Sequence, residues 1–157
     1  MNAPEPSDPV SYGVRAANLL EEACRLAPGS ANAPQLEVVR VLALDIGRQL
    51  DALAGLTREE VTPDVLAEAA LCCADLANLA ACNAPDLPPD AAPHAAEAAR
   101  LAAGAVGALG PMVEAGSGDP GTEHAGNLLR DMRSAAWRAG FAARLVEGSS
   151  GRERPAD

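Results

Sequence analysis

The chain has 157 residues, of which 36 are alanine and only three are aromatic. A β-sandwich or barrel needs β-branched and aromatic side chains to fill its pleated faces, and three scattered rings cannot form a stacking platform for single-stranded nucleic acid. The formal net charge is −10, and all twelve basic residues are arginine. Because an acidic chain repels phosphates and anionic lipid, we expect neither nucleic acid nor a membrane surface as a partner.

The length indicates one domain. We expect a single helical-bundle domain at residues 8–148, between a disordered lead-in at 1–7 and a disordered tail at 149–157. The acidity is uneven, because residues 1–118 carry 16 acids and 6 arginines, whereas residues 119–157 carry six of each. The first residues have neither the basic start nor the apolar core of a signal peptide.

Two helices are predicted in the first third of the chain. Asp8-Pro9 supplies an N-cap and a first-turn proline, and Pro28-Gly29 stops this helix. The second helix runs from Asn32 to Gly55, with apolar residues at alternating spacings of three and four. Val38 and Leu42 are expected to widen its buried face, as in a helix packed inside a bundle.

The third helix is predicted to begin at Thr62-Pro63 and is apolar nearly all round from Leu66 to Cys82. A helix with so few polar residues is either central in a bundle or covered by a partner chain. Cys73 and Leu76 are therefore expected at helix-packing or subunit contacts.

The fourth helix is built almost entirely from small residues. Asp90 is expected to cap it, and Gly110-Pro111 to kink or end it. Each glycine inside a helix costs about 1 kcal/mol relative to alanine. Gly104 and Gly107 are therefore predicted to lie where another helix backbone approaches closely.

A fifth helix is predicted from Asp119-Pro120 to about Val146. Its inward-facing residues are expected to be Leu128, Leu129, Met132, Ala136, Ala139, Ala143 and Val146. Its arginines lie elsewhere on its surface, where they either clamp a carboxylate or phosphate or pair with the acidic helices. Five helices with short connections predict an all-α, antiparallel bundle of about five helices with no sheet.

The cysteines, at 24, 72, 73 and 82, lack the spacing of a metal site or a disulfide framework. We expect no metal, and four free thiols that act as small apolar groups in a reducing cytoplasm. His94 and His124 fall in the first turns of the last two helices. The helix dipole there favours the neutral base, which suits catalysis, but such histidines are also ordinary solvated surface residues.

From residue 62 onward, several short sequence patterns follow one another in an order that carries a family resemblance. Pro63 opens a helix with Ala67-Glu68 a turn later, Asn83 lies near its end, Asp90 precedes the next helix, and Gly104-Ala105 lies within it. In this order, roughly residues 62–147 resemble the cyclodeaminase/cyclohydrolase family, which includes the helical cyclodeaminase domain of formiminotransferase-cyclodeaminase. Cys82 and Pro89 stand where that family has glycine and serine.

The resemblance implies a helical dimer that binds a folate and acts on its one-carbon unit. It gives Asn83 a hydrogen bond to the ligand and makes Asp90 either a helix cap or an acid/base. His94 is the third candidate ligand-binding residue.

Two functional interpretations follow. The first is a non-catalytic helical bundle without a cofactor, which acts in the cytoplasm by self- or partner association, most simply as a homodimer. It rests on the all-round apolarity of the third helix and the small-residue face of the fourth. The alternative is a cyclodeaminase-like protein that binds a folate or a similar small anionic ligand at a dimer interface.

Overall fold

The computed structural model describes residues 8–27, 32–119 and 121–150, and these residues form five α-helices and no strand. The all-α architecture predicted from the sequence is therefore confirmed. The helices are α1 (Pro9–Arg25), α2 (Ala33–Ala54), α3 (Pro63–Asn83), α4 (Ala92–Gly116) and α5 (Glu123–Ser150), with a short 3-10 helix, η1 (Ala84–Asp86). The expected lead-in at 1–7, the Pro28-Gly29 stop, Pro120 and residues 151–157 lie outside the described residues.

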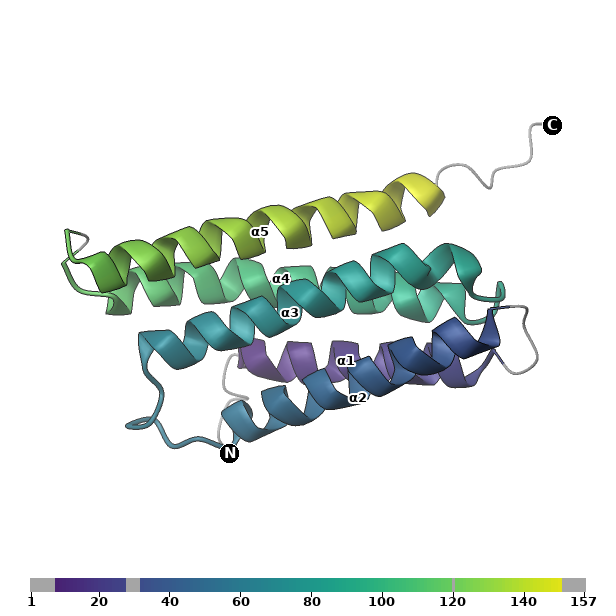
Figure 1. Ribbon diagram of the computed structural model, residues 1–157, viewed down its shortest axis with the longest axis horizontal. Helices are drawn as coiled ribbons and strands as arrows, with labels where there is room; N and C mark the ends of the chain where they lie inside the picture. The colour runs from purple at the N-terminus through teal and green to yellow at the C-terminus, as the bar shows by residue number, and fades with distance from the viewer. Residues whose placement is uncertain (1–7, 28–31, 120, 151–157) are drawn as a thin grey trace, which may run out of the picture.

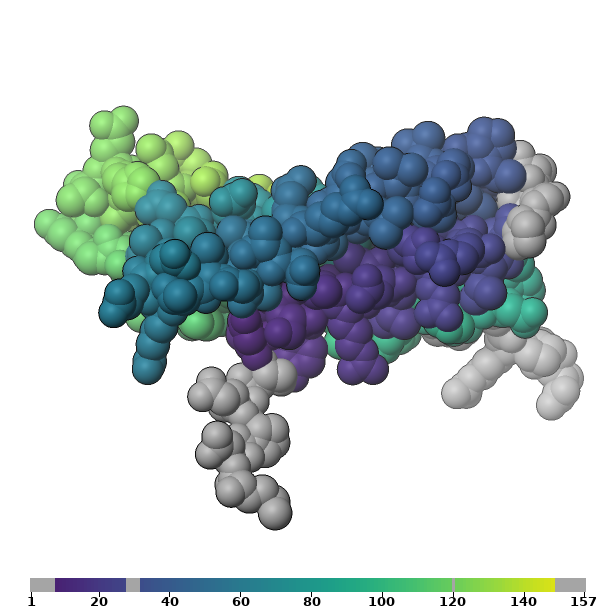
Figure 2. All heavy atoms as spheres, turned by 90° about the horizontal axis from the view of Figure 1, so that it is seen from below, coloured from purple at the N-terminus to yellow at the C-terminus, as the bar shows by residue number. Residues whose placement is uncertain are grey.

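Helices α3 and α4 form the central pair of the bundle (Figure 1). The α1–α2 hairpin packs on one side of this pair, mainly through α1 on α4, and α5 lies along the other side against both α3 and α4. Figure 2 shows the hairpin side, with α1 in purple and α2 in blue lying next to each other across it. Helices α2 and α5 therefore occupy opposite sides of the bundle.

Helix α3 is central, as its sequence predicts, because it contacts all four other helices. The segment Pro63–Asp86 is long and apolar enough to cross a membrane by length and composition. In the bundle, 56% of its most apolar 18-residue window is buried against the rest of the chain. The apolar composition of α3 is therefore that of a core helix enclosed by its neighbours.

The helix starts agree with the sequence where a side chain caps them. The Asp8 carboxylate accepts a hydrogen bond from the Val10 N–H at 3.1 Å, and the Thr62 hydroxyl accepts one from the Val65 N–H at 3.3 Å. The predicted start of the fifth helix at Asp119 is wrong. Helix α5 begins at Glu123, and the Thr122 hydroxyl accepts from the Ala125 N–H at 3.2 Å.

Helix α4 departs from the prediction at both ends. Asp90 does not cap it, because Ala91 occupies the capping position and no side chain bonds the first turn. The helix also continues through Pro111 to Gly116, because burial of the Val113 side chain stabilises one more turn. The carbonyl that Pro111 leaves without a partner belongs to exposed Gly107, where water can bond it.

Alanine supplies more than half of the core residues. Such small side chains let helix backbones approach closely, and among the described glycines Gly13 is the most tightly enclosed. A Cβ atom added there would lie 2.7 Å from the Cys73 Sγ and 3.0 Å from the Leu50 Cδ1. Helix α1 therefore meets α2 and α3 at a point where only glycine fits.

Gly104 and Gly107 differ from Gly13, because both are exposed and a Cβ atom at either would meet nothing within 4 Å. No helix among the described residues packs on them. The close contact predicted at these two glycines would therefore need a second chain, and it stays a prediction.

The buried side of α5 repeats at alternating spacings of three and four residues. It consists of Ala125, Leu128, Met132, Ala135, Ala139, Ala142 and Val146. The prediction that Ala136 faces inward is wrong, since Ala136 is exposed and its neighbour Ala135 is buried. Leu129 and Ala143, also predicted inward, are half-buried at the edge of this seam.

The predicted widening of the α2 face is also wrong. Val38 is 58% exposed and Leu42 is 42% exposed. Helix α2 packs extensively on α1 but only along a short contact on α3, so a narrow apolar stripe is enough to hold it. Its wider apolar surface faces away from the bundle.

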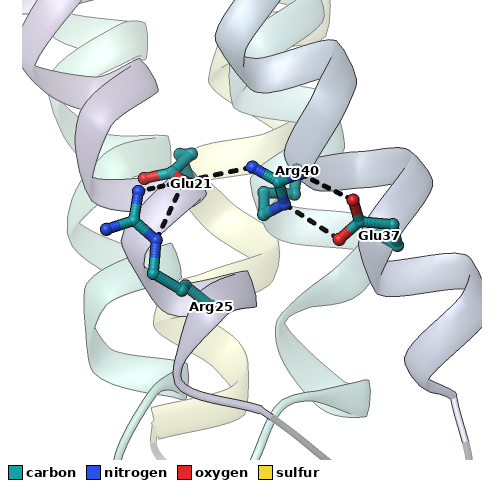
Figure 3. Close-up of polar contacts among 4 residues, drawn as sticks. All are labelled: Glu21, Arg25, Glu37 and Arg40. Atoms are coloured by element: carbon teal, nitrogen blue, oxygen red, sulfur yellow. Dashed lines mark hydrogen bonds and ion pairs between the residues drawn. The ribbon is translucent and has the colours of Figure 1, made fainter.

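A charged network joins α1 to α2 (Figure 3). Glu21 is a buried acid on α1, and its carboxylate accepts hydrogen bonds from Arg25 on the same helix. Arg40 on α2 reaches the same oxygen at 3.5 Å and also forms two hydrogen bonds, of 2.6 and 2.9 Å, with Glu37. Burial of Glu21 is thus compensated by two guanidinium groups.

The two kinds of glycine should respond to alanine in opposite directions. We expect Gly13→Ala to lower the free energy of unfolding by about 1–3 kcal/mol, because it overpacks the contact with Cys73. The matched variant Gly104→Ala should raise it by about 0.5–1 kcal/mol, because alanine favours the helix and meets open space. Urea unfolding followed by circular dichroism measures both, and a stabilised Gly13→Ala variant would contradict the packing described.

Removal of the buried carboxylate should cost more than removal of the exposed one. We expect Glu21→Gln to destabilise the bundle by about 1–3 kcal/mol, because two guanidinium groups lose a buried charged acceptor. Glu37→Gln, at an exposed position, should cost less than about 1 kcal/mol. Equal effects in the same urea titration would show that burial of Glu21 plays no part.

Candidate interaction surface

Asn83, the first candidate ligand-binding residue, is buried and engaged within the chain. Its side-chain oxygen accepts a hydrogen bond from the Gln35 Nε2 at 2.8 Å, and its Nδ2 donates to the Leu79 carbonyl at 2.8 Å. The amide thereby ties the start of α2 to the end of α3. These contacts give Asn83 a structural role.

Asp90 and His94 lie at the same end of the bundle as Asn83, where α3 ends and α4 begins (Figure 1). Asp90 is exposed, and His94 is half-buried in the first turn of α4 as predicted. The His94 Nδ1 is buried and has no hydrogen-bond partner among the described residues. The three candidates thus share a region of the bundle, while the Asn83 amide is committed to Gln35 and Leu79.

The cysteines are free thiols, as the sequence predicts. Burial raises the pKa of Cys24 from 9.0 to about 11, with a further contribution from Glu21, and burial raises the pKa of Cys73 to about 12. The pKa of half-buried Cys72 is raised as well, by burial and then by Glu68. Since the thiolate is the nucleophile and the metal ligand, burial makes these three thiols poorer nucleophiles and poorer metal ligands than an exposed cysteine.

The described residues contain no group of three or more His, Cys, Asp or Glu side chains that could hold a metal ion. A groove of about 630 Å³ lies near the start of α1, with the apolar side chains of Leu53, Val65 and Met112 in its wall. Its charged lining residues are Asp8 and Arg58, and the Asp8 carboxylate already caps α1. The groove has room for an apolar group but offers no paired acid and base.

Two polar pairs fix α5 on α3. The His124 ring lies 2.9 Å from the Asp64 carboxylate, and the Arg138 Nη1 donates to the Asp75 carboxylate at 2.7 Å. The pairing of Arg138 agrees with one of the two roles that the sequence allowed for the arginines of this helix. His124 is exposed, as a solvated surface histidine would be.

The opposite side of α5 carries the two largest apolar side chains of the protein. Trp137 is 68% exposed, Phe141 is 44% exposed, and Leu145 beside them is 41% exposed. The Trp137 and Phe141 rings are stacked, with centroids 5.9 Å apart and planes within 8° of parallel. Both rings are thus held together at the surface.

Three arginines flank these rings. At 3.6 residues per turn, Arg130, Arg133 and Arg144 lie within about 40° of Trp137 around the helix axis. All three are exposed, and none forms an ion pair within the part of the chain that the structure describes. We call this surface the α5 stripe: Arg130, Arg133, Trp137, Phe141, Arg144 and Leu145.

The sequence contains the signal for the α5 stripe in the position of its tryptophan. Trp137 lies diametrically opposite the seam that runs from Ala125 to Val146, so the correct seam implies an exposed tryptophan. A seam that contains Ala136 in place of Ala135 is displaced by one residue and does not imply this exposure.

The chain matches none of the known protein families, and no curated protein is significantly similar to it. The candidate surface therefore rests on the geometry described above.

The buried thiols predict a loss of stability at alkaline pH. Their pKa values are higher in the folded than in the unfolded protein, so their stabilising contribution is complete below pH 9. It is then lost as the pH rises toward 11 for Cys24 and 12 for Cys73, at roughly 1 kcal/mol per pH unit for each thiol. Urea titrations between pH 8 and 11 should give a shallower slope for the Cys24→Ala/Cys73→Ala variant. An equal slope in both proteins would contradict this assignment.

Proposed function

We propose that the protein is a non-catalytic helical bundle that acts in the cytoplasm by self- or partner association, with the α5 stripe as its contact surface. The observation that carries this proposal is the exposure of Trp137 next to Phe141, in a chain whose core is filled by alanine. Clustered large apolar side chains on a surface mark interaction sites. Tryptophan and arginine are also the residues that contribute most to binding energy at interfaces.

The remaining chemistry supports association rather than catalysis. Cys24 and Cys73 are protonated near neutral pH, and the Asn83 amide forms hydrogen bonds within the chain. Free thiols are also compatible with a reducing compartment such as the cytoplasm.

The alternative is a cyclodeaminase-like protein that binds a folate at a dimer interface. It is favoured by the buried His94 Nδ1, which has no partner among the described residues, at the end of the bundle that also holds Asp90. A ligand would have to replace Gln35 at Asn83, which gives this function less support than association. Loss of the absorbance of 5,10-methenyltetrahydrofolate on addition of the protein would favour it.

Truncation of the two rings should abolish association. We expect Trp137→Ala/Phe141→Ala to weaken it by at least about 30-fold, since the loss of even one such ring from the centre of a contact costs about 2 kcal/mol or more. Sedimentation of the purified protein from 10 μM to 1 mM measures self-association. Affinity capture from a cell extract, with the same two proteins, measures association with partners.

Leu26→Ala is the matched control, because Leu26 is also exposed (48%) but lies at the end of α1, away from α5. It should associate as the unmodified protein does. Circular dichroism should show the same helix content in all three proteins, since the changed side chains are exposed. A Trp137→Ala/Phe141→Ala protein that keeps every association of the unmodified chain would refute the proposed function.

A further inference from the structure

A second surface of the chain is apolar and exposed, as a binding partner of the α5 stripe would have to be. Val38 is 58% exposed, Val41 is 44% exposed and Leu42 is 42% exposed, all on the outer side of α2. We call these three residues the α2 patch. Together with Trp137, Phe141 and Leu145, they make up most of the exposed large apolar residues in the described part of the chain.

The charges around the two surfaces are complementary. The α5 stripe carries three arginines without an ion pair among the described residues. On α2, Asp45 follows the patch by one turn on the same side of the helix, and Arg48 approaches its carboxylate only to 3.7 Å. The patch also belongs to residues 1–118, which carry the whole net charge of −10.

We propose that the α5 stripe binds the α2 patch of a second copy of this chain, so that copies associate head to tail. This inference rests on the proposed function and names its partner. The alternative self-contact, α5 on α5, would bring the arginines of two stripes close together, and like charges at an interface are unfavourable. The contact with α2 instead places arginines near Asp45.

The fold imposes this geometry between copies. Helices α2 and α5 lie on opposite sides of the α3–α4 pair, so a chain cannot cover its own stripe with its own patch (Figure 1). A contact between two different surfaces leaves one stripe and one patch open at the ends of each assembly. Growth to larger assemblies with rising concentration is the expected result.

Two variants that each lack one surface test the proposal by mixing. Trp137→Ala/Phe141→Ala removes the stripe, and Val38→Arg/Leu42→Arg places positive charge on the patch. Each variant alone should be monomeric at concentrations where the unmodified chain assembles. An equimolar mixture should form a dimer with one chain of each kind, because one intact stripe and one intact patch remain.

The single tryptophan reports the contact directly. In the mixture only the patch variant contains Trp137, so its emission should shift to shorter wavelength when the stripe variant is added. The addition of Trp137→Ala/Phe141→Ala/Val38→Arg/Leu42→Arg, which contains no tryptophan and no intact patch, should cause no shift. Circular dichroism establishes that every variant is folded.

The outcomes separate this inference from the proposed function. If the patch variant assembles like the unmodified chain while the stripe variant does not, the stripe has another partner surface; the head-to-tail contact is then wrong and the proposed function stands. If the mixture stays monomeric, the inference is overturned as well. If removal of the stripe changes no association at all, both proposals fail.

Discussion

Close packing of small side chains is the constraint on which this bundle depends. Alanine fills the contacts between α1, α3, α4 and α5, and at Gly13 even a methyl group is too large. The largest fully buried side chains are leucine, valine and cysteine; no aromatic ring is among them. A core with such narrow gaps has no space for a ring, so Trp137, Phe141 and Tyr12 all lie at the surface.

Local chemistry made much of the fold predictable. The caps at Asp8 and Thr62 and the spacing of apolar residues located α1, α2 and α3 closely, since these signals lie within one turn of the chain. Neighbours in space were harder to predict. Residues 135 and 136 are both alanine, so the residue type does not show which of them faces the core. The exposure of Val38 arises because α2 contacts α3 only over a short length.

The candidate surface was less predictable for the same reason. Gly13 and Gly104 are both glycines inside a helix, yet Gly13 lies where helices cross and Gly104 faces open space. The position of Asn83 near a helix end suggested a ligand contact, whereas its hydrogen bonds to Gln35 and Leu79 depend on a residue 48 positions earlier and on the turn before it. The α5 stripe can be identified only when each buried residue of α5 has been assigned correctly.

The orientation of α5 explains why its rings stay in water in an isolated chain. A half turn of the helix would bury the rings, but the seam from Ala125 to Val146 contacts α3 and α4 through alanines that leave no room for them. It would also break the Arg138–Asp75 pair and bring Arg130 and Arg133 toward the core, where a charge without a partner is costly. The rings therefore cannot leave water by a rearrangement within the chain. They can leave it only by contact with another molecule, which gives the exposed stripe a thermodynamic reason to bind.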